Sequence, residues 1–240
     1  MSREAEVSIL THFSRNCESP PQSSTRRHVS RTALRRASIL ALAFAVLCLL
    51  VAFNVTGAVD WWGFTLTHLL VSYPLDVAAS LVTLLGGASV TGAIALVLSF
   101  SWSRHSGEQG LVPLLLFVGV AIEAGLKYVL PHSGPPHVLP RHAESPLLFH
   151  FAAPLFFHLS APYSFPSGHM LRTTFLAALI GNHQPRWRTV GWTLVCAMAF
   201  TLLYLNDHWV SDVGGGILLG LMLAAVAASI SARQPPRQQR

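Results

Sequence analysis

The sequence predicts an all-α integral membrane protein with about six transmembrane helices packed in one bundle. Of its 240 residues, 52% are hydrophobic and only 11% are charged, whereas a soluble domain carries about 25% charged residues. Several apolar stretches also approach the roughly 20 residues that cross the hydrocarbon core of a bilayer. Composition and segment length together argue against an unusually hydrophobic soluble enzyme.

The chain divides into a membrane domain and two short tails. Residues 1–36 are polar and rich in Ser, Pro and Arg, so we predict a disordered, basic cytoplasmic tail. Residues 37–233 form the expected membrane domain, and residues 234–240 a second cytoplasmic tail. The expected spans are Ser38–Val59, Leu75–Phe100, Gly110–Leu130, Ser167–Gly181, Thr189–Leu205 and Val210–Ala232.

The basic residues predict how the spans are oriented. With the amino terminus inside, Arg104, Arg186 and Arg188 fall on the same side as both tails, which places both termini in the cytoplasm. The net charge of +6 therefore reflects topology in a plasma or inner membrane, and we expect no nucleic-acid partner. The long loop 131–166 lies on the outer side, and its apolar piece Leu147–Leu159 suggests an interfacial helix that either guides a lipid or fills space.

Two pairs of polar residues stand at helix ends inside this apolar chain, where polar groups are costly. Glu123 and Lys127 are four residues apart, so they can form an ion pair along one helix face; a lysine reaching the membrane surface explains them equally well. His208 and Asp212 have the same spacing at the start of the last span. A carboxylate that accepts a hydrogen bond from one imidazole nitrogen leaves the other nitrogen available as a nucleophile.

The most specific motif is Pro166-Ser167-Gly168-His169, which precedes the fourth span. A serine hydroxyl and the backbone N–H groups of a glycine turn at a helix start form an anion site, and His169 stands beside it as a proton donor. Lys127, Ser167, His169 and His208 are all predicted at the outer ends of their helices. This shared side indicates one active site that faces outward.

These two motifs, in this order, resemble those of the type 2 phosphatidic acid phosphatase family, which is related to the vanadium haloperoxidases. The resemblance covers roughly residues 38–233 and implies a metal-independent lipid phosphatase without a cofactor. It implies that His208 attacks phosphorus to give a phosphohistidine and that Asp212 orients it. It also implies that His169 protonates the leaving oxygen, and that Lys127, Ser167 and the Gly168 backbone hold the phosphate.

The chain departs from this family at two positions that bind phosphate. Gly134 stands where the first motif has arginine, and Thr201-Leu202 stands where the third has Ser-Arg. Two missing arginines cost about 3–6 kcal/mol of phosphate binding unless other cations replace them. We expect Arg172, with Arg141 in support, to replace them; in the alternative, Arg172 pairs with a carboxylate such as Glu123 or Asp212.

The expected function is hydrolysis of a lipid-linked phosphate: phosphatidate, phosphatidylglycerophosphate or a polyprenyl diphosphate. A phosphotransferase of the same fold and an inactive relative that binds lipid phosphate remain as alternatives, and the oligomeric state stays open. The spacing of the loop histidines fits no metal-ligand pattern, so we expect no metal site and a pH-dependent activity instead. These histidines are His132, His137, His142, His150 and His158.

Overall fold

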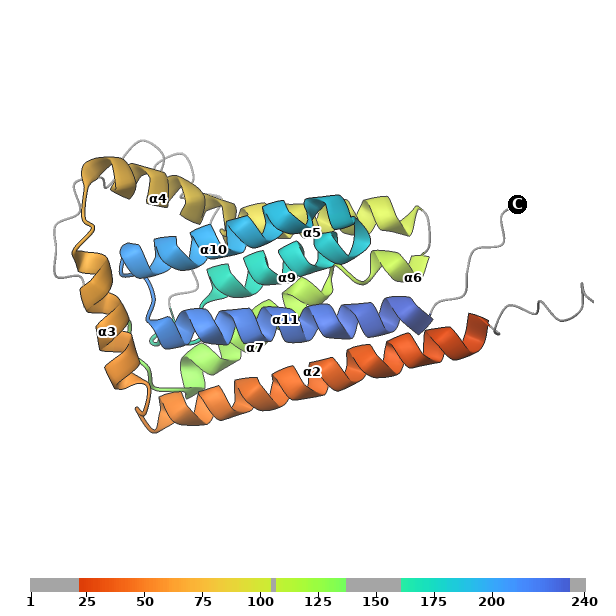
Figure 1. The fold of residues 1–240 in the computed structure, drawn as a ribbon, viewed down its shortest axis with the longest axis horizontal. Helices are drawn as coiled ribbons and strands as arrows, with labels where there is room; N and C mark the ends of the chain where they lie inside the picture. The colour runs from red at the N-terminus through yellow and green to blue at the C-terminus, as the bar shows by residue number, and fades with distance from the viewer. Residues whose placement is uncertain (1–21, 105–106, 137–160, 234–240) are drawn as a thin grey trace, which may run out of the picture.

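A computed structural model describes residues 22–104, 107–136 and 161–233. In these ranges all regular structure is helical, and most of the helices run side by side along the long axis of the molecule, while α3 crosses one end of the bundle (Figure 1). The helices are α2 (Gln22–Ala52), α3 (Gly57–His68), α4 (Tyr73–Leu85), α5 (Ala88–Ser103), α6 (Gly107–Gly110), α7 (Leu115–Val129), α9 (Gly168–His183), η2 (Pro185–Trp187), α10 (Arg188–Tyr204) and α11 (Val210–Arg233).

Helix α2 begins well inside the predicted tail, so the prediction of disorder up to residue 36 is wrong for residues 22–36. Ser30, Ala33 and Ala37 are buried, and their spacing places them on one face of the helix. This face packs against α11, where the Ser30 hydroxyl donates a hydrogen bond to the Ser229 carbonyl, with 3.3 Å between the oxygens. Small residues allow two helices to approach closely, and this contact orders a segment whose composition is polar.

The first two predicted spans also differ from the structure. The first ends at Ala52, and after a turn with Asn54 at φ 55° the chain forms α3, which the sequence analysis did not predict. The second is divided into α4 and α5 by Gly86 and Gly87. The break exposes the Gly86 carbonyl, which accepts two hydrogen bonds from a distant helix, as described below.

Four stretches of helix are long and apolar enough to cross a membrane: 28–52, 73–103, 108–129 and 210–232. Helices α9 and α10, with 16 and 17 residues, correspond to the two short spans of the prediction. The structure thus supports an all-helical integral membrane protein, while six spans and the side of each terminus stay predictions.

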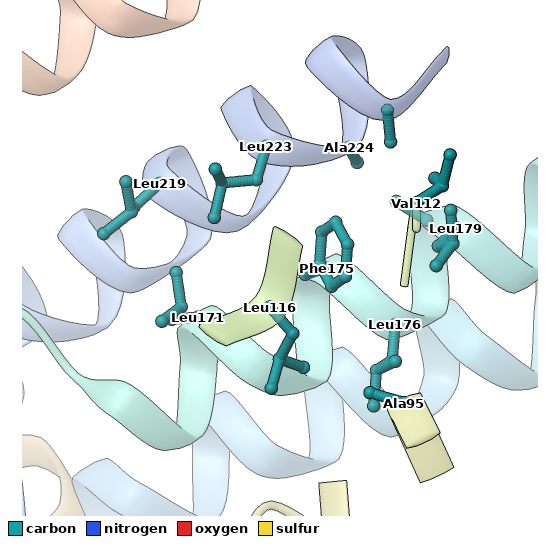
Figure 2. Packing of buried hydrophobic residues seen from close by; sticks show 12 residues of the cluster. Ala95, Val112, Leu116, Leu171, Phe175, Leu176, Leu179, Leu219, Leu223 and Ala224 are labelled. Carbon is teal, nitrogen blue, oxygen red and sulfur yellow. The ribbon is translucent and has the colours of Figure 1, made fainter. Parts of the chain in front are cut away.

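Helix α9 lies at the centre of the bundle. Leu171 and Phe175 on α9 pack against Leu116, Leu219 and Leu223 of α7 and α11 (Figure 2). Glycines let α11 approach the α9 backbone directly: a Cβ on Gly216 would lie 2.5 Å from the Ser167 carbonyl oxygen, and one on Gly220 would lie 2.7 Å from that of Leu171. This packing fixes the start of α9, where the candidate site lies.

Candidate active site

The turn before α11 holds a paired histidine and aspartate. His208 Nδ1 lies 3.3 Å from Oδ2 of Asp212, which is fully buried and also accepts a hydrogen bond from the Trp209 backbone N–H at 3.0 Å. Because α11 begins at Val210, His208 precedes the helix, so the pair is held by a turn and not by one helix face as predicted. With Nδ1 engaged, Nε2 of His208 is the nitrogen available as a nucleophile.

A second histidine reaches the same aspartate from the other side. His132 Nε2 lies 3.5 Å from Asp212 Oδ1 and 3.2 Å from the Ser211 hydroxyl. Ser211 in turn donates from its backbone N–H and its hydroxyl to the two carboxylate oxygens of Asp60 on α3, at 2.8 and 3.0 Å. All four residues are buried. The segment that carries Asp212 is therefore held by His132 directly and by Asp60 of α3 through Ser211.

Sequence reasoning missed the roles of His132 and Asp60. His132 was one of five histidines in a proline-rich loop, and Asp60 was placed in an outer connection. For Asp60 one signal existed, because a carboxylate inside an apolar segment requires a buried partner. For His132 no local signal separates it from its neighbours.

The start of α9 is joined to the turn before α11. The Ser167 backbone N–H donates to the Asp212 carbonyl at 3.0 Å, and the Ser167 hydroxyl caps the helix by accepting from the Met170 N–H at 3.5 Å. His169, one residue into the helix, is half-buried and lies against Gly86 at the break between α4 and α5. The structure thus joins Ser167, two residues before His169, to the segment that carries His208 and Asp212.

Helix α7 brings a carboxylate to the same place. Glu123 Oε1 forms an ion pair with Lys127 Nζ at 2.9 Å, and its carboxylate packs so closely on Gly168 that a Cβ there would overlap it. The close approach of Glu123 therefore leaves no room for a side chain at position 168. The pairing of Lys127 with Glu123 agrees with the predicted i, i+4 contact.

Arg172 is buried and pairs with protein groups. Its Nε and one terminal nitrogen donate to the Gly86 carbonyl at 3.1 and 3.0 Å, and the other terminal nitrogen lies 3.3 Å from Glu123 Oε2. Pairing with Glu123 is the alternative that the sequence left open. The guanidinium of Arg172 on α9 therefore contacts both α7 and the break between α4 and α5.

The positions of the missing arginines hold no cation. Gly134 has no side chain, Leu202 is fully buried, and the Thr201 hydroxyl donates to the Ala197 carbonyl of its own helix at 2.7 Å. Arg141, the interfacial helix and the remaining loop histidines lie outside the described residues. The described cluster therefore offers Lys127 and Arg172 against three carboxylates when the imidazoles are neutral: Asp60, Glu123 and Asp212.

Among the described residues, no three His, Cys, Asp or Glu side chains are arranged to hold a metal ion. Metal independence remains a prediction.

Fold and site together define a helical membrane protein in which a histidine paired with a buried aspartate adjoins a Pro-Ser-Gly-His helix start. A family model of the PAP2 superfamily matches residues 110–235, and the chain belongs to that superfamily. Its fold is similar to the crystal structure of a transmembrane PAP2-type phosphatidylglycerolphosphate phosphatase from Bacillus subtilis. The TM-score is 0.63 at 20% identity, over 80% of this chain and 94% of that one. No curated protein matches the sequence significantly.

Proposed function

We propose that this protein hydrolyses a lipid-linked phosphate without a metal ion, through a phosphohistidine on His208. The observation that carries the proposal is the pairing of His208 Nδ1 with buried Asp212, whose own backbone carbonyl holds Ser167 at the start of α9. The nucleophile and the phosphate-binding turn are thus fixed to the same residue.

The reaction would proceed in two steps. His208 Nε2 donates its electron pair to phosphorus, and the bond from phosphorus to the lipid oxygen breaks as His169 gives that oxygen a proton. Water then attacks the phosphohistidine, passes a proton to His169, and releases inorganic phosphate. Asp212 stabilises the positive charge that develops on His208 during the attack.

Lys127 and the N–H groups at the start of α9 would hold the phosphate oxygens, with the Ser167 hydroxyl as a further donor. We assign Arg172 an indirect part: its contacts hold Glu123, and Glu123 in turn holds Lys127 toward the site. Arg141, if it takes part, would act from the loop that follows Gly134.

The substrate class follows from the apolar surroundings of the site. Phosphatidate, phosphatidylglycerophosphate and polyprenyl diphosphates all place a phosphate at the membrane surface, and the similar Bacillus protein is named for the second of these. The start of α2 and the end of α11 lie at one end of the bundle and the turn between α10 and α11 at the other (Figure 1). With both termini in the cytoplasm, the site would face outward.

The test is phosphate release by the detergent-purified chain from these three lipids in the presence of a chelator. We expect release by the wild type, loss in His208→Ala, and full activity in His28→Ala, a control at an exposed histidine of α2. Release that stops on chelation would refute metal independence. Phosphate that moves from the lipid to an added alcohol but not to water would indicate a transferase, and folded protein without either reaction would indicate a binding role.

A further inference from the structure

A groove of about 430 Å³ runs between α5, α9 and α10, from the break between α4 and α5 to the far end of α9. Its volume lies within the roughly 300–1,000 Å³ of small-molecule sites. Each helix contributes residues three or four positions apart, which is one helix face. The body of the groove is apolar and includes Ile94, Leu98, Leu176, Ile180, Val190 and Leu194.

The groove has one apolar end and one polar end. Leu85 and Thr91 line it near the break between α4 and α5, and Trp102, His183 and Trp187 line it at the far end of α9. The rings of Trp102 and His183 lie 4.3 Å apart. Since His183 ends α9 14 residues after His169 and an α-helix rises 1.5 Å per residue, this end lies about 21 Å along the helix from His169. Tryptophans at such a position mark a membrane–water interface.

Three exposed arginines surround the polar end. Arg186 donates a hydrogen bond at 3.3 Å to the side chain of Gln184, which lines the groove. Arg188 lies beside Gly181 of α9. Arg104 follows Trp102 by two residues and lies over the ring of Phe100. Among the described residues at this end, Glu108 is the one acidic residue. An apolar slot with a basic rim at an interface complements an anionic lipid, whose chain is apolar and whose phosphate is negative.

We infer that this groove binds the acyl chain of an anionic phospholipid from the leaflet opposite the active site, with its phosphate at Arg186 and Arg188. Such a lipid is not the substrate, because its phosphate would lie beyond the end of α9, which is about 21 Å along the helix from His169. It fills the space between α5 and the pair α9–α10 and so supports the helix that carries the site. This second lipid site does not rest on the proposed catalytic function.

The experiment measures lipid retained by the detergent-purified full chain, using native mass spectrometry with phosphatidylglycerol and phosphatidylcholine of identical acyl chains. We expect wild type to retain phosphatidylglycerol preferentially. In the double variant Arg186→Gln/Arg188→Gln this preference falls up to roughly 30-fold, since each arginine near a surface contributes about 1 kcal/mol, which is about a fivefold change in affinity. The matched control Arg31→Gln/Arg35→Gln removes two exposed arginines from α2 and should leave the preference unchanged.

A second variant tests the groove itself. Leu194→Trp would fill it and lower the retention of both lipids, while hydrolysis of a water-soluble phosphate ester reports that the fold is intact. Equal retention of the two lipids by wild type, an unchanged preference in the arginine variant, or full retention in Leu194→Trp would each overturn the inference. If wild type hydrolyses no ester, a thermal unfolding scan shows instead whether Leu194→Trp is folded. The lipid-retention measurements then still test the groove.

Discussion

Arg172 could compensate for the family's missing arginines in two ways. It either binds the phosphate directly or holds Glu123, which in turn positions Lys127. In the structure its three hydrogen bonds go to Glu123 and to the Gly86 carbonyl. Hydrogen bonds between membrane helices contribute on average about 0.6 kcal/mol and at most about 1.7 kcal/mol each. The change Arg172→Met, which keeps the apolar stem of the side chain and removes the guanidinium, should therefore cost about 2–5 kcal/mol of unfolding free energy.

A double-mutant cycle with Glu123→Gln isolates the contact between the two side chains. We expect a coupling of about 0.6–1.7 kcal/mol in unfolding free energy, measured by denaturant titration in mixed micelles. Activity should fall in both single variants mainly through kcat, because Lys127 loses its support. A coupling near zero, with an increase in KM alone for Arg172→Met, would refute this reasoning and show that Arg172 binds the phosphate directly.

Three further substitutions follow from the contacts. His132→Ala should lower kcat about tenfold with little change in KM, because it removes the hydrogen bond to the Ser211 hydroxyl and the contact with Asp212 Oδ1, together worth about 1.4 kcal/mol. His132→Gln should recover part of the activity, and equal loss in both variants would contradict the role. Gly216→Ala should lower the unfolding free energy by about 1–3 kcal/mol in thermal unfolding, since the added Cβ would meet the Ser167 carbonyl. Gly214→Ala is the control that should be tolerated, because the nearest atom to a Cβ there is 3.7 Å away. Gly168→Ala should reduce phosphate release by displacing a carboxylate of α7, and a fully active variant would show that this carboxylate can move.

Much of the site could be predicted from the sequence because its parts are short and local. The motif Pro166–His169 and the pair His208–Asp212 carry their chemistry in the residue types and spacing, and the structure joins the two segments through Ser167. The long apolar helices were predicted for the same reason, since apolar length is a local property, whereas α3 and the break between α4 and α5 were not predicted. Where the pattern was polar, as in residues 22–36, the prediction was wrong because burial against α11 cannot be seen in α2 alone.

Only the tertiary structure decided which partners these residues have. Arg172 had two candidate carboxylates, and packing of α9 against α7 selected Glu123. His132 was one of five loop histidines, and the position of its segment beside α11 brought it to Asp212. Residue types and their spacing along the chain determine which chemistry is available. Contacts between segments far apart in sequence depend on how the helices pack, so only the folded bundle determines which of these groups pair with one another.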